Sequence, residues 1–389
     1  MKKILFVSHE ASRTGAPSVL LSLMEKIKSE ELYQFDVLLI NEKEEVDILE
    51  DFRGLTSNVF VWNRKKKTAF WKLFNVLFFN GLQELHERKL LKLLKKNNYT
   101  LIYANSVASS KEALIIKNYL SISTILHVHE LEYLTNWIVG NEQFSDIVNG
   151  FDYFIAVSYA VRDNLINNYG VPSQKIKVVY SFTSNLDAEK IEMFNDDIYD
   201  QLSISDKTFV VGAAGSVYWV KGFDIFILLA DYFCSNYPEV DCLFTWVGNV
   251  PSYERMQIDH DLKKLNLTDK VKFVGKKSNP MHYFNAFDIF VLTSREESFG
   301  LVCLESATLS KPVICFDKVG GIVEFVEDDA GFVVPYLSIK EMAEKIFILY
   351  QNENLRKKMG AKAKEKAIAK YSKEISIESI LKVIDDCLN

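Results

Sequence analysis

The sequence predicts an α/β protein that contains two doubly wound, parallel-sheet domains in series. Short β-rich runs alternate with helix-length amphipathic segments along the chain, which is the pattern of parallel α/β sheets. The alternation stops once, near the middle of the chain, and then restarts. With 389 residues, the chain is long enough for two ordinary domains, each with its own hydrophobic core.

The first domain is expected to span residues 1–185. Helical patterns occur in it, notably at Ser18–Lys28 and Ala108–Leu120. Apolar density and periodicity then fall, so residues 186–206 are predicted to form a linker. The runs with the length and composition of buried strands are Ile4–Val7, Phe35–Leu39, Asn58–Val61, Leu101–Ala104, Thr124–Val128 and Tyr153–Val157.

The second domain is expected to span residues 207–372. Its predicted strands are Phe209–Ala214, Leu243–Val247, Val271–Val274, Ile289–Leu292, Val313–Phe316 and Gly331–Val334. Residues 373–389 contain one more amphipathic helix, at Ile375–Leu388. Doubly wound sheets bind ligands at the carboxyl ends of their strands, so we expect a binding cleft between the two domains.

Composition excludes several classes of protein. A hydrophobic content of 48% is typical of a globular protein, and a net charge of −6 argues against a general nucleic-acid binder. The five cysteines never form a C-x-x-C pair, which favours reduced thiols over a disulfide or zinc framework. The apolar run at the start is too short for a signal-peptide core and fits a first strand better, and no run approaches a membrane span. We therefore expect a soluble, cytoplasmic protein.

One segment differs in charge from the rest. Residues 62–100 carry ten Lys or Arg and two Glu, so the net charge is +8 there and −14 over the rest of the chain. One interpretation is a domain helix with a solvated basic face. The other is a patch that contacts an anionic membrane or accepts a lipid-linked substrate. The aromatic residues interleaved with the basic ones are Phe70, Trp71, Phe74, Phe78 and Phe79.

The segment "SREESFGLVCLESATLSKPVICF", residues 294–316, places Glu297 and Glu305 eight positions apart. A helix that begins near Phe299 leaves its first amides, through Val302, without intrahelical partners, and these amides favour an anion. Gly300 lets a ligand approach the backbone closely. A bound diphosphate would then meet Glu297, and sugar hydroxyls would reach Glu305. The alternative is that both acids are solvated.

A second element, "VVGAAGSVYWVKGFDIFILLA" at residues 210–230, predicts a strand, a glycine-rich turn and a helix with Lys221 at its start. It matches neither the P-loop nor the G-x-G-x-x-G dinucleotide pattern. A cation at the start of a helix is unfavourable on dipole grounds. A phosphate bound between Lys221 and the helix near Phe299 would remove this conflict, and we favour it over a solvated lysine.

Glu297 and Glu305 in "EESFGLVCLE" resemble the E-x7-E motif of the retaining glycosyltransferases of family 4, which have the GT-B fold. The resemblance covers nearly the whole chain. The other segments that carry it are "HEASRTGAPSVLLSLM", "HVHE", "FIAVSYAVRDNLINNYGVPSQKIKVVY", "GSVYWVKGFD" and "VKFVGKKSNPMHYFNAFDIFVLTSREESFGLVCLE". It implies two Rossmann-like domains that face each other across a cleft, with the C-terminal helix crossing back to the first domain.

The resemblance also implies roles for individual residues. Glu297 would contact the transferred sugar, His129 would face it from the first domain, and Lys221 would bind the donor diphosphate. Glu305 would hold the ribose hydroxyls. The residues assigned in this way to donor binding are Gly15, Ser216, Lys221, Val274, Gly275, Ser298, Phe299, Gly300, Leu301, Val302 and Glu305.

The chain departs from the family pattern at two places. Ser216 stands where the family often has an arginine, and Gly15 lies in Thr-Gly-Ala-Pro where the family often has Gly-Gly-x-Glu. The first departure removes one positive charge from the phosphate site. Lys221 and the helix amides would therefore have to supply more of the positive charge that stabilises the phosphate.

Two observations bear on metal binding. His127 and His129 lie at a strand end and are expected to point to opposite sides, His129 toward the cleft, so they would not share an ion. The one Asp-x-Asp triplet, Asp259 to Asp261, lies in a predicted helix, where its two acids do not share a face. We therefore expect transfer that needs no metal and no other cofactor.

The expected partners are a UDP- or GDP-sugar donor and a saccharide or lipid-linked acceptor, with surface polysaccharide synthesis as the favoured setting. Retention of configuration is implied by the family. Two alternatives remain: a non-catalytic subunit of a glycosyltransferase pair, and a different enzyme on the same fold, such as a nucleotide-sugar epimerase. Turnover of a donor by the purified protein alone would separate the first alternative from the expected activity.

Overall fold

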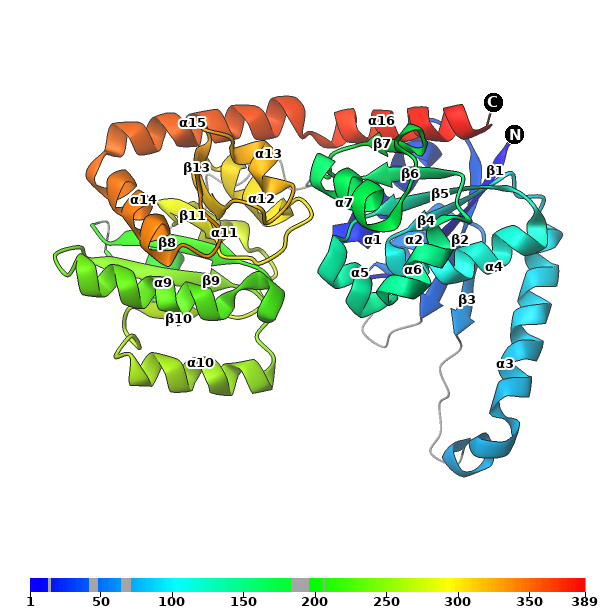
Figure 1. Ribbon diagram of the computed structural model, residues 1–389, viewed down its shortest axis with the longest axis horizontal. Coiled ribbons are helices and arrows are strands. Elements are labelled where there is room, and N and C mark those ends of the chain that lie inside the picture. The colour runs from blue at the N-terminus through cyan, green and yellow to red at the C-terminus, as the bar shows by residue number, and fades with distance from the viewer. Residues whose placement is uncertain (13–14, 42–47, 64–70, 183–195, 206, 389) are drawn as a thin grey trace. The chain divides into compact units, whose positions relative to one another are not determined.

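The computed structural model describes residues 1–12, 15–41, 48–63, 71–182, 196–205 and 207–388. The chain divides into two compact units, which Figure 1 shows as ribbons. Unit 1 comprises Met1–Tyr180 together with Glu374–Asn389, and unit 2 comprises Ser181–Lys373. Each unit is built around one parallel sheet.

The sheet of unit 1 has seven strands in the order β3-β2-β1-β4-β5-β6-β7. Its strands are β1 (Lys3–Ser8), β2 (Gln34–Asn41), β3 (Val59–Asn63), β4 (Leu101–Asn105), β5 (Ser123–Val128), β6 (Tyr153–Ala156) and β7 (Ile176–Val178). The helical segments are α1 (Gly15–Ser29), α2 (Leu49–Leu55), α3 (Trp71–Lys95), η1 (Val107–Ser109), α4 (Ser110–Leu120), α5 (Glu132–Ile138), α6 (Asn141–Val148), α7 (Tyr159–Tyr169), η2 (Ser173–Lys175) and α16 (Lys373–Leu388).

The sheet of unit 2 has six strands in the order β10-β9-β8-β11-β12-β13. Its strands are β8 (Phe209–Ala214), β9 (Cys242–Val247), β10 (Val271–Phe273), β11 (Ile289–Leu292), β12 (Val313–Phe316) and β13 (Gly331–Val334). The helical segments are α8 (Asp196–Leu202), η4 (Trp219–Lys221), α9 (Phe223–Asn236), α10 (Ser252–Lys264), α11 (Met281–Asn285), α12 (Leu301–Thr308), α13 (Ile322–Val326), α14 (Ile339–Gln351) and α15 (Glu353–Lys370).

Both sheets are doubly wound, as the sequence predicted. In each, the chain moves outward from its first strand in one direction and then returns to build the other side, next to that first strand. Right-handed crossovers then place helices on both faces of the sheet. The inner strands are accordingly buried along nearly their whole length; Ile4 to Val7 in β1, for example, are fully buried.

The structure differs from the sequence prediction in two elements. Strand β7 was missed, because it has only three residues and one of them is exposed, which leaves no periodic signal. The predicted linker, 186–206, includes the short helix α8. Residues 183–195 of that linker lie outside the described residues.

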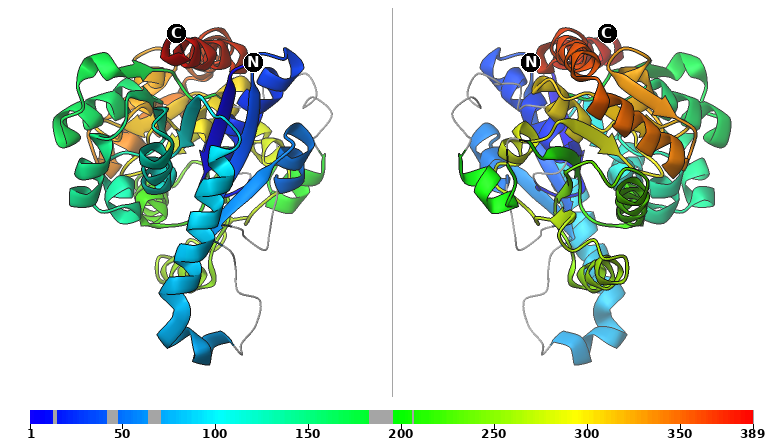
Figure 2. Two further views of the ribbon diagram at one scale, coloured as in Figure 1. Left: turned by 90° about the vertical axis from the view of Figure 1, so that its right-hand side faces the viewer. Right: turned by 90° about the vertical axis from the view of Figure 1, so that its left-hand side faces the viewer.

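The last helix, α16, belongs to unit 1. The ammonium of Lys2 donates a hydrogen bond of 2.5 Å to the carbonyl of Leu388, and the hydroxyl of Tyr33 donates to the carboxylate of Asp385. The inner side of the helix is apolar and buried, with Ile380 and Ile384 nearly inaccessible to solvent. These contacts fix both ends of the chain on the same unit (Figures 1 and 2).

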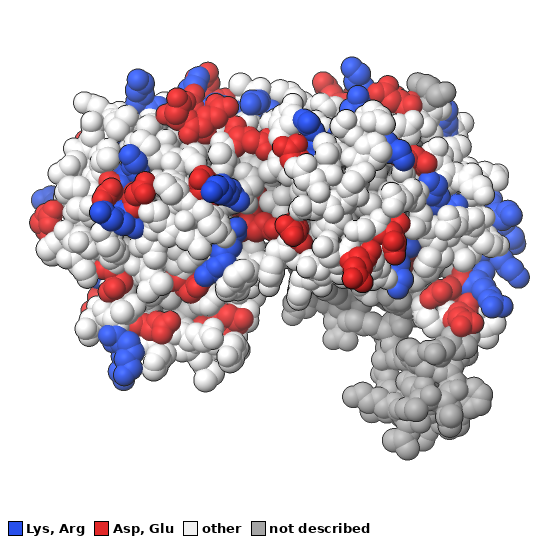
Figure 3. All heavy atoms as spheres, viewed as in Figure 1, with Lys and Arg blue, Asp and Glu red and all other residues white. Residues whose placement is uncertain are grey.

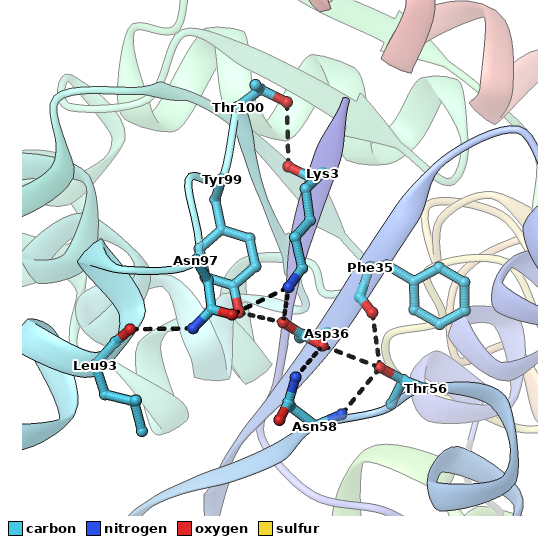
Figure 4. A network of polar contacts seen from close by, with 9 residues as sticks. All are labelled: Lys3, Phe35, Asp36, Thr56, Asn58, Leu93, Asn97, Tyr99 and Thr100. Atoms are coloured by element: carbon cyan, nitrogen blue, oxygen red, sulfur yellow. Dashed lines mark hydrogen bonds and ion pairs between the residues drawn. The ribbon is translucent and has the colours of Figure 1, made fainter. Parts of the chain in front are cut away.

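A polar network closes the amino-terminal edge of the unit 1 sheet (Figure 4). Its centre is Asp36 on β2, whose side chain is 1% exposed and lies 2.6 Å from the ammonium of Lys3. The hydroxyl of Tyr99 and the amide of Asn58 also donate to this carboxylate, at 2.5 and 3.0 Å. Burial alone would raise the pKa of Asp36, but these hydrogen bonds hold it below its usual value.

Charged residues of both signs are interspersed over the surface shown in Figure 3. No helix in the described part of the chain is long and apolar enough to span a membrane. Helix α3 falls in the basic segment 62–100 and projects from unit 1 (Figures 1 and 2). Residue 70 lies outside the described residues, and the aromatic side chains at positions 71, 74, 78 and 79 are outside what the structure describes of this helix.

Candidate functional site

The strand order of unit 2 reverses between β8 and β11, which are hydrogen-bonded neighbours. At such a reversal, the loops that follow the two strands diverge toward opposite faces of the sheet and leave room for a ligand. The loop after β8 contains Ser216 and Lys221, and the loop after β11 contains Glu297. Two segments chosen from the sequence for their chemistry therefore meet at the point where the fold favours binding.

The loop after β8 is held against the end of β11 by close backbone contacts. Gly222 has a φ of 68°, and a Cβ placed on it would lie 1.9 Å from the carbonyl oxygen of Thr293. Only glycine permits this approach. The Thr293 hydroxyl donates to the Gly222 carbonyl at 3.0 Å, and the Arg295 amide donates to the Val220 carbonyl at 2.7 Å. These bonds fix the position of Lys221, which ends the turn η4.

The side chain of Arg295 makes a second set of contacts between the same two loops. Its guanidinium donates to both carboxylate oxygens of Asp224, at 2.9 and 2.7 Å, and to the carbonyl of Trp219 at 2.6 Å. It also lies 4.6 Å from the centre of the Trp219 ring. Bidentate arginine–carboxylate pairs are strong and directional. The turn that carries Lys221 is therefore held from both sides.

Glu297 is fixed through its backbone. Its amide donates to the carbonyl of Val319 at 2.6 Å, and its carbonyl accepts from the amide of Gly321 at 3.1 Å. Glu297 also forms an isolated parallel bridge with Gly320. The residue is 9% exposed. Such a buried carboxylate needs a partner, because an unpaired buried charge is costly.

The partner is Lys221, whose ammonium lies 2.6 Å from Oε2 of Glu297. The hydroxyl of Ser294 donates to the same oxygen at 3.3 Å. Burial alone would lower the pKa of Lys221, but the charges of Glu297 and Tyr218 raise it above its ordinary value. The lysine is therefore protonated at neutral pH. Its position at the start of helix α9 is unfavourable for a cation, and the negative charge of Glu297 compensates for this.

Helix α12 begins at Leu301, two residues later than the sequence indicated. Gly300 is the N-cap residue, with a φ of 82°, and its Cβ position lies 3.3 Å from Cγ of Glu297. The first amides of the helix, at Leu301 and Val302, have no intrahelical acceptor and carry the positive end of the helix dipole. Phe299 is buried and packs on the ring of Tyr371, 5.2 Å away between centroids, which anchors this turn.

The remaining predicted residues of unit 2 are placed at or near the same edge of the sheet. Val274 and Gly275 directly follow β10, and Gly275 accepts a hydrogen bond of 3.1 Å from the amide of Gly248, which follows β9. Ser216 is exposed in the loop after β8. Ser298 precedes the Gly300 cap, and Glu305 is half-buried about one turn into α12.

Unit 1 carries its own polar cluster where its strand order reverses, between β1 and β4. His129 follows β5, and Nε2 of its ring lies 3.1 Å from Oδ1 of Asn105, the last residue of β4. The amide nitrogen of Asn105 donates to the carbonyl of Ala16 at 2.9 Å, next to Gly15 at the start of α1. The structure thus brings the predicted His129 and Gly15 segments together within one unit, through Asn105.

The expectation that His127 and His129 point to opposite sides was wrong. Their ring centroids are 4.1 Å apart. Side chains alternate between the two faces of a strand, so residues two positions apart share a face. The predicted argument against a shared ion therefore fails, although no group of three metal-ligating side chains was found in the described ranges.

Several residues of the unit 1 cluster were missed. Asn105 and Ser106 are fully or almost fully buried, and Glu130 is 7% exposed. The Ser106 hydroxyl donates to Glu130 at 2.5 Å, and the amides of Val107 and His129 donate to its other oxygen. Burial raises the pKa of Glu130, and these hydrogen bonds offset part of the effect. A usable signal was present, since Asn-Ser directly follows the predicted strand Leu101–Ala104.

Comparisons with known proteins agree with this arrangement. Residues 22–183 match the model of the family described as Glycosyltransferase Family 4, and residues 194–366 match the model described as Glycosyl transferases group 1. The chain is 26% identical to the capsular polysaccharide biosynthesis glycosyltransferase CapM of Staphylococcus aureus, in a match that spans 60% of this chain and 66% of that protein. It is 25% identical to N-acetyl-alpha-D-glucosaminyl L-malate synthase of Bacillus anthracis, over 77% of this chain and 76% of that protein.

The fold has close structural neighbours as well. The crystal structure of Anabaena HepE in complex with UDP and glucose matches with a TM-score of 0.80 and 21% identity, covering 99% of this chain and 100% of that one. The two sheets and their strand orders are those of the GT-B fold. The chain belongs to the group 1 glycosyltransferases of family 4.

Proposed function

We propose that the protein is a retaining, metal-independent glycosyltransferase that moves a sugar from a nucleotide-diphosphate sugar to a saccharide or lipid-linked acceptor. The observation that supports this most directly is the buried pair of Lys221 and Glu297, next to the N-terminus of α12 and at the strand reversal of unit 2. A protonated lysine and free helix amides are suited to a diphosphate.

The chemistry needs stabilisation of a leaving diphosphate. When the bond between the sugar and the diphosphate breaks, negative charge grows on the phosphate oxygens, and fixed positive groups nearby lower the barrier. Lys221 would provide one full charge, and the amides of Leu301 and Val302 would provide the helix dipole. Glu297 holds the ammonium in place and, as the family resemblance implies, would contact the transferred sugar.

The other donor contacts are proposed residue by residue. Glu305 would accept hydrogen bonds from the ribose hydroxyls, and the backbone at Val274 and Gly275 would meet the base. Ser216, Ser298 and the backbone of residues 299–302 would line the diphosphate and sugar. In unit 1, His129 and the Gly15 loop are proposed to contact the sugar and the donor phosphate, respectively.

The donor and the setting are proposed from the relatives. HepE has been crystallised with UDP-glucose, and CapM is named for capsular polysaccharide biosynthesis. We therefore favour a UDP-sugar over a GDP-sugar, and bacterial surface polysaccharide synthesis as the setting. Contact of residues 62–100 with an anionic membrane stays a prediction, which sedimentation with acidic liposomes at low and physiological salt would test.

Metal independence is proposed on the position of the Asp-x-Asp triplet. Asp259 and Asp261 lie on α10, where side chains two residues apart diverge and do not chelate one ion. Retention is proposed from the family, with the acceptor attacking from the face that the diphosphate leaves. A phosphate oxygen would take the acceptor proton.

The test uses the purified full chain alone. UDP-, GDP- and dTDP-sugars are first screened for protection against thermal unfolding, since a bound donor stabilises the folded form. The stabilising donor is then incubated with candidate saccharide acceptors, with and without EDTA, and the anomeric configuration of the product is read by NMR. We expect turnover that EDTA does not abolish and a retained configuration. Binding without turnover would favour the accessory-subunit alternative, and inversion would refute the mechanism.

A further inference from the structure

Asn105 makes two hydrogen bonds that together determine the state of His129. Its Nδ2 lies 2.9 Å from the carbonyl oxygen of Ala16, and its Oδ1 lies 3.1 Å from Nε2 of His129. A carbonyl only accepts, so the amino group of Asn105 must face Ala16. Its Oδ1, which also only accepts, must then face His129. The proton of the neutral imidazole is therefore on Nε2, and Nδ1 keeps its lone pair.

The surroundings of His129 keep the ring neutral. Burial lowers its pKa to about 3, and the neighbouring His9 adds to the effect. The ring of His127 on β5 lies 4.1 Å from that of His129 between centroids, tilted by 41°, and is itself buried, with its pKa lowered. The carboxylate of Glu130 accepts from the backbone amide of His129 and from Ser106, and that of Glu10 lies 3.7 Å from Nε2 of His9. Among the described residues, none places a carboxylate against the His129 ring.

Burial and hydrogen bonds at the end of β4 restrain the orientation of Asn105. Asn105 itself is fully buried. The next residue, Ser106, has a φ of 84°, a conformation that non-glycine residues rarely adopt. It is kept there by the hydrogen bond to Glu130 and by the amide of Ala108, which donates to the Ser106 hydroxyl at 3.2 Å. Strain held in place by buried bonds is typical of residues that must be oriented accurately.

We infer that Asn105 is a positioning residue, which couples the Gly15 loop to His129 and fixes the ring so that Nδ1 is the atom available to accept a hydrogen bond from a sugar hydroxyl. The second half of this inference rests on the proposed function, because it takes the ligand to be a sugar. The first half, the tautomer and its cause, does not. Two measurements therefore separate the two halves.

The first measurement reads the tautomer without any substrate. The full chain is labelled with 15N at histidine, and the His129 signals are assigned by their loss in His129→Gln. We expect an Nε2–H tautomer that does not titrate between about pH 5 and pH 8. In Asn105→Asp, a carboxylate replaces the amide oxygen and raises the pKa of His129, so the ring should become titratable in this range. An Nδ1–H tautomer in the wild type, or no change in Asn105→Asp, overturns the inference.

The second measurement reads activity against pH. In Asn105→Asp, His129 becomes charged as the pH falls through its raised pKa, and Nδ1 turns from acceptor into donor. We expect kcat to fall at least about 10-fold on that acidic limb, with partial recovery at higher pH, while Asn105→Leu loses activity at every pH. A pH profile of Asn105→Asp that is parallel to that of the wild type would refute the sugar contact, even if the tautomer is as inferred.

Asn97, in the turn between α3 and β4, offers a control of the same residue type in unit 1. Its Nδ2 donates to the carbonyl of Leu93 at 3.0 Å, and its Oδ1 accepts from Lys3 at 3.1 Å, so it bridges a carbonyl and a side-chain donor in the way that Asn105 does (Figure 4). Asn97→Asp makes the same chemical change at the opposite edge. We expect a wild-type pH profile and an unchanged His129 signal. A similar acidic limb in both variants would refute the inference, since it would trace the effect to the added charge.

Discussion

Two buried lysine–carboxylate pairs in this chain have almost the same geometry and different surroundings. Lys3 and Asp36 lie 2.6 Å apart, with side chains 18% and 1% exposed; Lys221 and Glu297 also lie 2.6 Å apart, with side chains 21% and 10% exposed. The first pair is at the amino-terminal edge of the unit 1 sheet. The second is at the carboxyl-terminal edge of the unit 2 sheet.

The pairs differ in how completely their hydrogen-bonding capacity is used. Around the Lys3–Asp36 pair, the carboxylate receives side-chain donors on both oxygens, from Lys3, Tyr99, Asn58 and Thr56, and the ammonium has a second acceptor in Asn97 (Figure 4). In the described part of unit 2, the ammonium of Lys221 has Glu297 as its one hydrogen-bond acceptor, and only Oε2 of Glu297 accepts.

This difference separates a structural ion pair from one that is suited to a ligand. A buried charge with every bond made within the chain gives rigidity and offers nothing to a substrate. An ammonium with two unused N–H groups, beside free helix amides, is prepared for an anion. The distance within each pair and its burial do not distinguish the two pairs. What distinguishes them is whether the remaining donors and acceptors of the lysine and the carboxylate have hydrogen-bond partners within the chain.

The largest expected effect is on activity at Lys221. Lys221→Ala removes the full charge proposed to stabilise the leaving diphosphate, and we expect kcat to fall by about 100-fold or more. The measurement is release of the nucleoside diphosphate from the donor that the thermal screen identifies. Lys357→Ala is the matched control, because Lys357 also lies 2.6 Å from a glutamate of unit 2, but on the surface. A near-normal rate in Lys221→Ala would show that the Lys221–Glu297 pair, like the Lys3–Asp36 pair, has a structural role only.

The next effect is on stability at Asp36. Asp36→Ala leaves Lys3 without its main partner in a buried site, and breaking such a pair lowers the free energy of unfolding by about 3–5 kcal/mol. Urea-induced unfolding of the full chain measures this. The donor turnover of the folded variant should stay within about two-fold of the wild type. The Asp36 network lies at the amino-terminal edge of the unit 1 sheet, whereas the candidate site residues follow the carboxyl ends of strands.

Glu50→Ala is the control for the stability measurement. Glu50 lies 2.6 Å from Arg53 in the same unit, but the two side chains are 82% and 51% exposed. An exposed pair contributes little, because water solvates both charges. We expect no measurable shift of the urea midpoint. A shift as large as that of Asp36→Ala would show that burial and bond satisfaction are not what distinguishes the Asp36 network.

Much of the fold could be predicted from local periodicity. Strands such as those at Ile4–Val7 and Ile289–Leu292 are continuous apolar runs bounded by polar residues, and the structure has a strand at each. Strand β7 was not predicted because a run of three residues is too short to show periodicity. Helix α12 was placed two residues early because the φ of 82° at Gly300 is a property of the folded turn and is not encoded as a composition signal.

The site could be predicted only in part. Lys221 and Glu297 were chosen one by one, for the chemistry of an anion at a helix N-terminus. Their ion pair joins residues 76 positions apart and depends on the contact of Gly222 with Thr293, which no local pattern shows. For Asn105 the local signal was its place at the end of a predicted strand, but its partners, 24 and 89 positions away, are not evident from the sequence.

The pH dependence of the two pairs should have opposite signs. The pKa of Asp36 is lowered on folding, so its contribution to stability is present above its ordinary value of 3.8 and is lost as the pH falls through the folded value. The pKa of Lys221 is raised, so its contribution is present below 10.5 and is lost as the pH rises through the folded value.

Urea midpoints in acid and alkali measure these contributions. We expect Asp36→Asn to flatten the loss of stability below about pH 4, and Lys221→Met to flatten the loss above about pH 10. Between these limits, the difference between each variant and the wild type should be constant. If Asp36→Asn instead changed the alkaline limb, the hydrogen bonds to Asp36 would not be the cause of its lowered pKa.

The smallest effects should come from two hydroxyl groups at equal distances from the two carboxylates. Ser294 donates to Glu297 and Thr56 donates to Asp36, each at 3.3 Å. Thr56→Val removes the bond to Asp36 together with the bonds of the same hydroxyl to the Phe35 carbonyl, at 2.7 Å, and from the Asn58 amide, at 3.4 Å. We expect a loss of about 0.5–1.5 kcal/mol in the free energy of unfolding for each bond lost, and a normal rate of donor turnover. Ser294→Ala removes the one hydroxyl that orients Glu297, so we expect a few-fold lower kcat and little change in stability. The paired comparison matches the distance and the type of the bond to the carboxylate, although the Thr56 hydroxyl also bonds to the backbone of Phe35 and Asn58. If both variants lost stability and neither lost activity, the unused bonding capacity at Lys221 and Glu297 would have no connection with a ligand.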